Sequence, residues 1–200
     1  MKNLKLSILF LLGLVLFTAT INSCNKTTKS ISEEDTKALL FMLEEEKLAR
    51  DTYIFLADKW DIQQFANIKD SEQKHMDAIA SVLDEYKIQY TILEIGKFDE
   101  TKLQGLYDQF LIDGIISSEH ALQIGATIED LDIMDLVNYE NAATNQDVKD
   151  VFSTLRCGSR NHIRKFTESI VNDGDNYTPQ FISLADYTSI TNSSNEKCGK

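Results

Sequence analysis

The sequence contains little that would interrupt helices. It has one proline, Pro179, and eight glycines among 200 residues. No segment shows the sustained alternation of apolar and polar residues that indicates a half-buried strand. Signals for helices dominate instead, and we expect an all-α domain.

Cysteine and basic residues are also scarce. None of the three cysteines forms a CxxC pair or a Cys/His cluster, so a structural zinc site of the usual type is excluded. Twenty basic residues face 32 acidic ones, for a net charge of −12. Such an acidic surface repels phosphate backbones, so nucleic acid is not an expected partner, whereas cations are compatible with it.

The first residues follow the plan of a secretory signal. Lys2 and Lys5 precede a mostly apolar run from Leu6 to Ile21. The run is too short to span a bilayer comfortably, because a transmembrane helix needs about 20 apolar residues. Removing residues 1–23 takes away both lysines, and 18 basic against 32 acidic residues then give a net charge of −14.

The end of this run resembles a lipobox. Ile21-Asn22-Ser23-Cys24 fits a signal that is cut before a lipidated cysteine. Acyl chains on Cys24 would hold the protein on a membrane, at about 0.8 kcal/mol per buried methylene. The alternative is an ordinary signal peptide with an unrelated cysteine. Asn25 is not acidic, which favours the periplasmic face of the outer membrane.

The rest of the chain divides into three parts. Residues 24–32 are polar and predict a flexible tether, residues 33–187 have the length of one domain, and the Ser/Asn-rich residues 188–200 predict a disordered tail. Export would place Cys157 and Cys198 in a compartment that permits disulfides. They can pair and hold the tail, or remain free thiols.

Helix-start and helix-stop residues predict four long helices and a short one. A first helix starts at the N-cap Ser32 and ends near residue 60, and a second covers residues 65–86. A short helix over residues 101–112 ends at Gly114. Ser117 or Ser118 then caps a helix that ends near residue 138, and the last one covers 146–172 before Gly174. This order predicts a four-helix bundle with a long middle crossover.

Polar residues interrupt the apolar stripes of the first two long helices. Glu46 lies in the stripe of the first helix, whereas Glu44 and Glu45 are expected at the surface. Glu72 and His75 lie in the stripe of the second, and their i, i+3 spacing lets both reach one point. A carboxylate on a buried stripe is costly unless it is paired or binds a metal.

The last two long helices repeat the pattern less completely. Glu129 and His162 lie on apolar faces, and Asp132 lies one turn beyond Glu129. The position three before His162 is Ser159, and Asp132 is a candidate replacement for a missing acid there. His120 is expected on the opposite, exposed side. Taken alone, a glutamate on a stripe is often a boundary residue, and a lone histidine is often a satisfied core residue.

These segments resemble known proteins. Glu46-Lys-Leu-Ala-Arg-Asp-Thr-Tyr53 and Ser71-Glu72-Gln-Lys-His75 resemble the first half of a rubrerythrin-type ferritin-like domain. Gly125-Ala-Thr-Ile-Glu129-Asp-Leu-Asp132-Ile and Gly158-Ser-Arg-Asn-His162 resemble the bacterial ferritin-like family called domain of unknown function 2202. The resemblance implies a ferritin-like bundle and a centre of one or two iron ions, or another divalent metal. Its ligands would be Glu46, Glu72, His75, Glu129 and His162, with Tyr53 nearby. Ser159 departs from the superfamily, which has a glutamate there.

The sequence therefore predicts an envelope protein that binds metal for storage, redox detoxification or simple binding. The alternative is a non-enzymatic scaffold that keeps the bundle without a working metal centre. A bundle for haem or a small organic molecule has little support, because methionines at helical spacing are more often core residues. The sequence leaves catalysis and dimerisation open.

Overall fold

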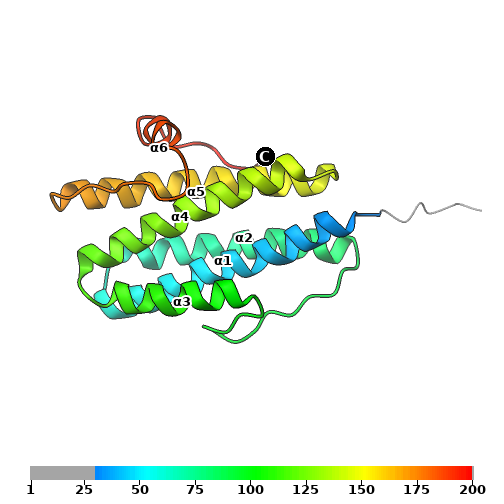
Figure 1. Ribbon diagram of the computed structural model, residues 1–200, viewed down its shortest axis with the longest axis horizontal. Helices are drawn as coiled ribbons and strands as arrows, with labels where there is room; N and C mark the ends of the chain where they lie inside the picture. Colours follow the sequence, from blue (N-terminus) through cyan, green and yellow to red (C-terminus); the bar gives the residue numbers. More distant parts are fainter. Residues whose placement is uncertain (1–29, 200) are drawn as a thin grey trace, which may run out of the picture.

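The computed structural model describes residues 30–199, and all of their regular structure is helical (Figure 1). The elements are α1 (Glu33–Trp60), α2 (Gln63–Glu85), α3 (Thr101–Gly114), α4 (Ser118–Ala142), α5 (Gln146–Asn172) and α6 (Leu184–Thr191). Within these residues there is no strand, so the prediction of an all-α domain is confirmed. The expected signal 1–23, Cys24 and most of the expected tether lie outside the described residues.

Local capping explains where the long helices begin and end. The Ser32 hydroxyl accepts a hydrogen bond from the Asp35 amide at 2.9 Å, and Ser117 caps α4 in the same way. Gly174 follows α5 with φ +84°, a conformation that costs glycine nothing. The predicted ends of the helices are therefore correct to within a few residues.

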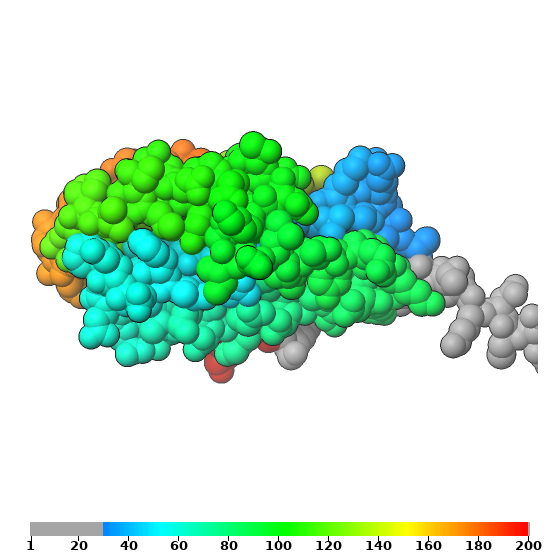
Figure 2. Space-filling model, turned by 90° about the horizontal axis from the view of Figure 1, so that it is seen from below, coloured from blue at the N-terminus to red at the C-terminus, as the bar shows by residue number. Residues whose placement is uncertain are grey.

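The four long helices form two packed pairs. α1 packs along α2, and α4 packs along α5 (Figure 1). The colours in Figure 1 show α1 and α5 running one way and α2 and α4 the other. From the end of α2, a connection over residues 86–100 leads into α3. α3 then runs back along the bundle to the start of α4 (Figure 1). From the side shown in Figure 2, α3 lies over the middle of α1.

A buried ion pair holds this connection to α1. Lys47 donates from Nζ to Asp51 Oδ2 at 2.6 Å and to the carbonyls of Glu94 at 2.9 Å and Lys97 at 3.0 Å. All the donors of this buried ammonium group therefore have acceptors, as a buried charge requires.

The apolar core consists of two clusters. One contains Tyr53, Phe65 and Phe166, whose ring centroids lie 5.5–5.7 Å apart. The other contains Met42, Met76 and Phe152. The polar residues of the candidate site lie on the same helices between these clusters, so they are enclosed in a medium of low polarity.

The C-terminal segment differs from the expected disordered tail over residues 188–200. Helix α6 continues to Thr191, and Glu196 accepts hydrogen bonds from Arg160 and Arg164 on α5. Cys198 forms a disulfide with Cys157 on α5, with a Cα–Cα distance of 5.5 Å. The disulfide is one of the two alternatives that the sequence left open for these cysteines. The hydrogen bonds of Glu196 connect positions far apart in the sequence, so no local pattern in the tail predicts them.

The segment before α6 is anchored on a buried aspartate. Asp130 accepts hydrogen bonds from the Tyr177 hydroxyl at 2.8 Å and from the amides of Phe181 at 3.0 Å and Ile182 at 2.9 Å.

None of the helices among residues 30–199 is long and apolar enough to span a bilayer.

Candidate metal centre

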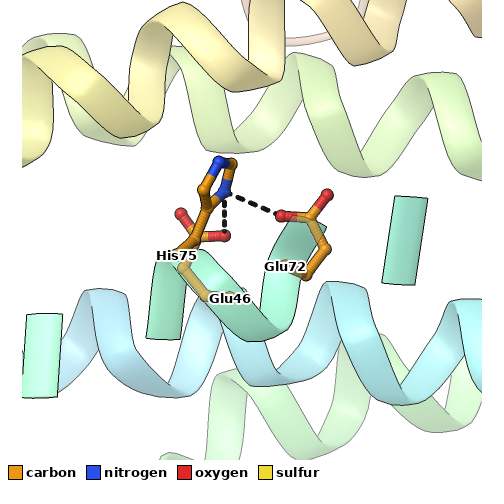
Figure 3. Close-up of side chains that lie close together, drawn as sticks. All are labelled: Glu46, Glu72 and His75. Atoms are coloured by element: carbon orange, nitrogen blue, oxygen red, sulfur yellow. Dashed lines mark hydrogen bonds and ion pairs between the residues drawn. The ribbon is translucent and has the colours of Figure 1, made fainter. Parts of the chain in front are cut away.

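The first polar group joins α1 and α2. His75 Nδ1 lies 3.0 Å from Glu46 Oε2 and 2.9 Å from Glu72 Oε2 (Figure 3). Glu72 and His75 lie on one face of α2 because three residues are nearly one helical turn. All three side chains are almost completely buried. One point between them would therefore be within reach of two carboxylates and an imidazole.

The second group joins α2, α4 and α5. His162 Nδ1 lies 2.8 Å from Glu72 Oε1 and 3.4 Å from Glu129 Oε2. The rings of His75 and His162 stack with their centroids 5.6 Å apart. Glu72 takes part in both groups, with one carboxylate oxygen directed to each histidine. The two groups, each of which could hold a metal ion, therefore share the Glu72 carboxylate.

Several buried ligand atoms in these groups form no hydrogen bond. They are Glu46 Oε1, Glu72 Oε1 and His162 Nδ1. His162 Nδ1 is close to Glu72 Oε1, but the two atoms are not oriented for a hydrogen bond. Buried polar atoms normally have a partner, and atoms left without one cost about 1–3 kcal/mol each, more when charged. An ion in the first group would give Glu46 Oε1 a partner, and an ion in the second would do so for Glu72 Oε1 and His162 Nδ1.

Neighbouring groups orient the candidate ligands. The Tyr53 hydroxyl donates to Glu129 Oε1 at 2.6 Å, and the outer nitrogen of His162, Nε2, lies 3.0 Å from the Ser71 hydroxyl. Histidines that bind metal usually have such a contact on the nitrogen that does not bind. Ser71 and His162 also line a pocket of about 450 Å³ between α2 and α5.

A glycine on α5 makes room for the first histidine. A Cβ atom at Gly158 would lie 2.5 Å from His75 Nε2 and 2.7 Å from its Cε1. Any side chain at position 158 would therefore move the imidazole out of its position between Glu46 and Glu72. The backbone of α5 closes the site on this side.

Burial and mutual charge set the ionisation of the cluster. Burial lowers the pKa of both histidines, but the nearby carboxylates raise it more, to about 10 for His162 and well above its usual range for His75. Burial raises the pKa of Glu46 to about 8, partly offset by His75. It also raises the pKa of Glu72, but His162 and His75 outweigh it and lower that pKa well below its usual range.

Asp132 lies beside these groups and belongs to neither. Its Oδ2 accepts a short hydrogen bond from the Ser159 hydroxyl, and its Oδ1 is buried without a partner. The sequence proposed Asp132 as a replacement for an acid at position 159. The structure brings these two side chains into contact, so the Asp132 carboxylate on α4 lies beside the Ser159 hydroxyl on α5.

Two sequence expectations about nearby residues have different outcomes. His120 is exposed and lies beside the cap residue Ser117, as expected. Glu45 was expected at the surface, but it is only 2 % exposed. α1 is packed against α2, α3 and α4, so it has little free surface. A second apolar line on α1, through Phe41, Leu48 and Phe55, was the available sign of this burial.

Comparison with known proteins places the chain in a family. Residues 35–194 match the family model described as "Uncharacterized protein domain (DUF2202)". The chain belongs to this family. It is 47 % identical over 169 residues to "Uncharacterized protein MJ0754" of Methanocaldococcus jannaschii, covering 84 % of this chain and 91 % of that protein.

The fold is shared with a solved structure of this relative. The crystal structure of hypothetical protein MJ0754 from Methanococcus jannaschii superposes with a TM-score of 0.82 at 47 % identity. The match covers 84 % of this chain and 97 % of that one.

Proposed function

We propose that the protein is a ferritin-like metal-binding protein of the cell envelope, whose interior cluster holds one or two iron ions. The observation that carries this proposal is the pair of carboxylate/histidine groups that share Glu72 and contain buried ligand atoms without hydrogen bonds. Carboxylate and imidazole ligands together suit iron and related divalent ions. The function would be binding, storage or redox detoxification.

The residues present fit such ions. Glu46 and His75 would hold one ion, Glu129 and His162 a second, and Glu72 would contact both. Bound iron would supply electrons to small oxidants such as dioxygen or peroxide. The chain itself would orient the ligands through Tyr53 and exclude bulk water with its two apolar clusters. A small molecule could approach His162 through the pocket between α2 and α5, which His162 lines.

The test is metal content of the full chain, purified in mild detergent after growth in iron-supplemented medium. We expect one or two irons per chain by mass spectrometry and their loss in Glu72→Ala/His75→Ala. Glu34→Gln/Asp58→Asn changes two exposed acids on α1 and should keep the iron. Equal iron in the wild type and the Glu72/His75 variant would refute the proposal.

A second function is supported by Ser159, which has a neutral hydroxyl where the ferritin-like superfamily has a glutamate. The bundle would then be a non-enzymatic scaffold whose interior ion pairs, such as His75 with Glu46, are satisfied internally. Thermal melting with and without a chelator distinguishes the two functions, because a ligand of the native state raises stability by mass action. A melting temperature that does not change would favour the scaffold.

A further inference from the structure

A buried carboxylate outside the two carboxylate/histidine groups has no donor. Glu45 on α1 is 2 % exposed, and neither of its oxygens accepts a hydrogen bond. Leaving an ionised carboxylate in this state is among the most costly arrangements in a protein interior. Glu45 therefore needs a proton, a cation or both.

The neighbours of Glu45 are mainly acids. The carboxyl group of Asp135 on α4 lies within hydrogen-bonding reach of Glu45, and Glu46 is the next acid along α1. Asp135 Oδ2 is itself buried without a hydrogen bond. Lys102 Nζ lies 4.0 Å from Asp135 Oδ2, and the lysine side chain is 60 % exposed. This lysine is too well hydrated to neutralise two carboxylates.

The charges of the acids in and beside the candidate metal centre can be counted. Glu46, Glu72, Glu129 and Asp132 carry four negative charges when ionised, which two divalent ions would balance with both histidines neutral. Glu45 and Asp135 lie beyond this set and add two more. One further divalent ion would balance them, with Lys102 at the rim.

We propose that Glu45 and Asp135 form an auxiliary divalent-cation site between α1 and α4, with water completing the coordination. The site has only oxygen ligands and no histidine, so it would take hard cations such as Mn²⁺, Mg²⁺ or Fe²⁺. Asp135 provides the access, because its side chain is 13 % exposed whereas Glu45 is enclosed. The site goes beyond the proposed function and does not depend on it.

The experiment counts Mn²⁺ ions bound per full chain in mild detergent, by equilibrium dialysis and by the loss of the free-ion electron paramagnetic resonance signal. Glu45→Gln/Asp135→Asn should bind one ion fewer than the wild type. The matched control Glu34→Gln/Asp58→Asn, which removes two exposed acids, should bind as many as the wild type. Glu72→Ala/His75→Ala should keep one ion, which is lost when Glu45→Gln/Asp135→Asn is added.

Equal Mn²⁺ numbers in the wild type and Glu45→Gln/Asp135→Asn would overturn the site and leave a proton shared between two carboxyl groups. The variant should fold, because its amides supply donors where two acids now meet, and its melting temperature in chelator should equal or exceed that of the wild type. Asp135→Asn alone, at the partly exposed position, gives the same test if the double variant does not fold. A wild type that binds one ion, lost in the Glu45/Asp135 variant, would support this site while refuting the central one.

Discussion

Substitution of Gly158 by alanine tests how tightly α5 encloses the site. The new Cβ would lie 2.5 Å from His75 Nε2, and the ring cannot move freely because its other nitrogen contacts two carboxylates. Overpacking of this kind costs about 1–3 kcal/mol. Alanine also gains about 1 kcal/mol over glycine within a helix, which would partly hide the cost.

Gly105→Ala provides the control for this gain. Gly105 lies on the exposed side of α3, and a Cβ there meets nothing within 4 Å. The difference between the two variants therefore isolates the contact with His75. At about 2–4 °C per kcal/mol for a domain of this size, Gly158→Ala should melt about 2–12 °C below Gly105→Ala. If the proposed metal-binding function is correct, metal should also stabilise Gly158→Ala much less than it stabilises the wild type. If Gly158→Ala melts as high as Gly105→Ala, the tight packing of His75 against α5 is refuted.

Three further predictions concern the C-terminal segment. Cys157→Ser should lower the free energy of unfolding by about 4 kcal/mol, because the disulfide joins residues 41 positions apart and restricts the unfolded chain. Denaturant unfolding with and without reductant measures this difference. Asp130→Asn should lower the free energy of unfolding by about 1–3 kcal/mol, because an amide NH2 group would replace a carboxylate oxygen that accepts buried hydrogen bonds. Urea unfolding measures the change, and an unchanged midpoint would contradict it. Hydrogen bonds from Arg160, and more weakly from Arg164, lower the pKa of Glu196 to about 2. The ionised Glu196 therefore stabilises the folded state fully above about pH 4.5, and this contribution is lost as the pH falls toward 2. The melting difference between the wild type and Glu196→Gln should therefore be constant above about pH 5 and shrink below about 4.5, whereas a difference that grows on acidification would reverse this reasoning.

The helices and the central polar residues could be predicted because both depend on local rules. Ser32, Ser117 and Gly174 act on the turn next to them, and a period of 3.6 residues places Glu72 and His75 on one face whatever the partner helix is. Which groups meet across helices is a different question. The contact of Ser159 with Asp132 depends on how α4 and α5 cross, although the sequence suggested Asp132 for this place.

The burial of Glu45 and the helical and hydrogen-bonded order of the tail were missed for the same physical reason. Of the contacts that hold the tail, the Cys157–Cys198 disulfide was among the alternatives that the sequence offered. The burial of Glu45 depends on α3 and α4 covering sides of α1 that a single helix would leave exposed. The order of the tail depends on Cys157, Arg160 and Arg164 on α5, more than 30 residues before Glu196 and Cys198. Its Ser/Asn-rich composition still describes its polar surface correctly, but composition carries no information about such distant partners.

The exchange at position 159 bears on the choice between a metal protein and a scaffold. The superfamily resemblance places a glutamate there on α5, and this chain instead has Asp132 on α4 in contact with Ser159. Together with Glu46, Glu72 and Glu129, Asp132 makes four buried carboxyl groups in this part of the interior. A scaffold without metal gains little from this, because apolar residues of similar volume replace buried ionic groups at no cost or with a gain in stability. The proposed pair of divalent cations, in contrast, would be balanced by the charges of Glu46, Glu72 and Glu129 together with that of the neighbouring Asp132. If the proposed metal-binding function is correct, Asp132→Asn should weaken metal binding more than it changes the stability of the metal-free fold.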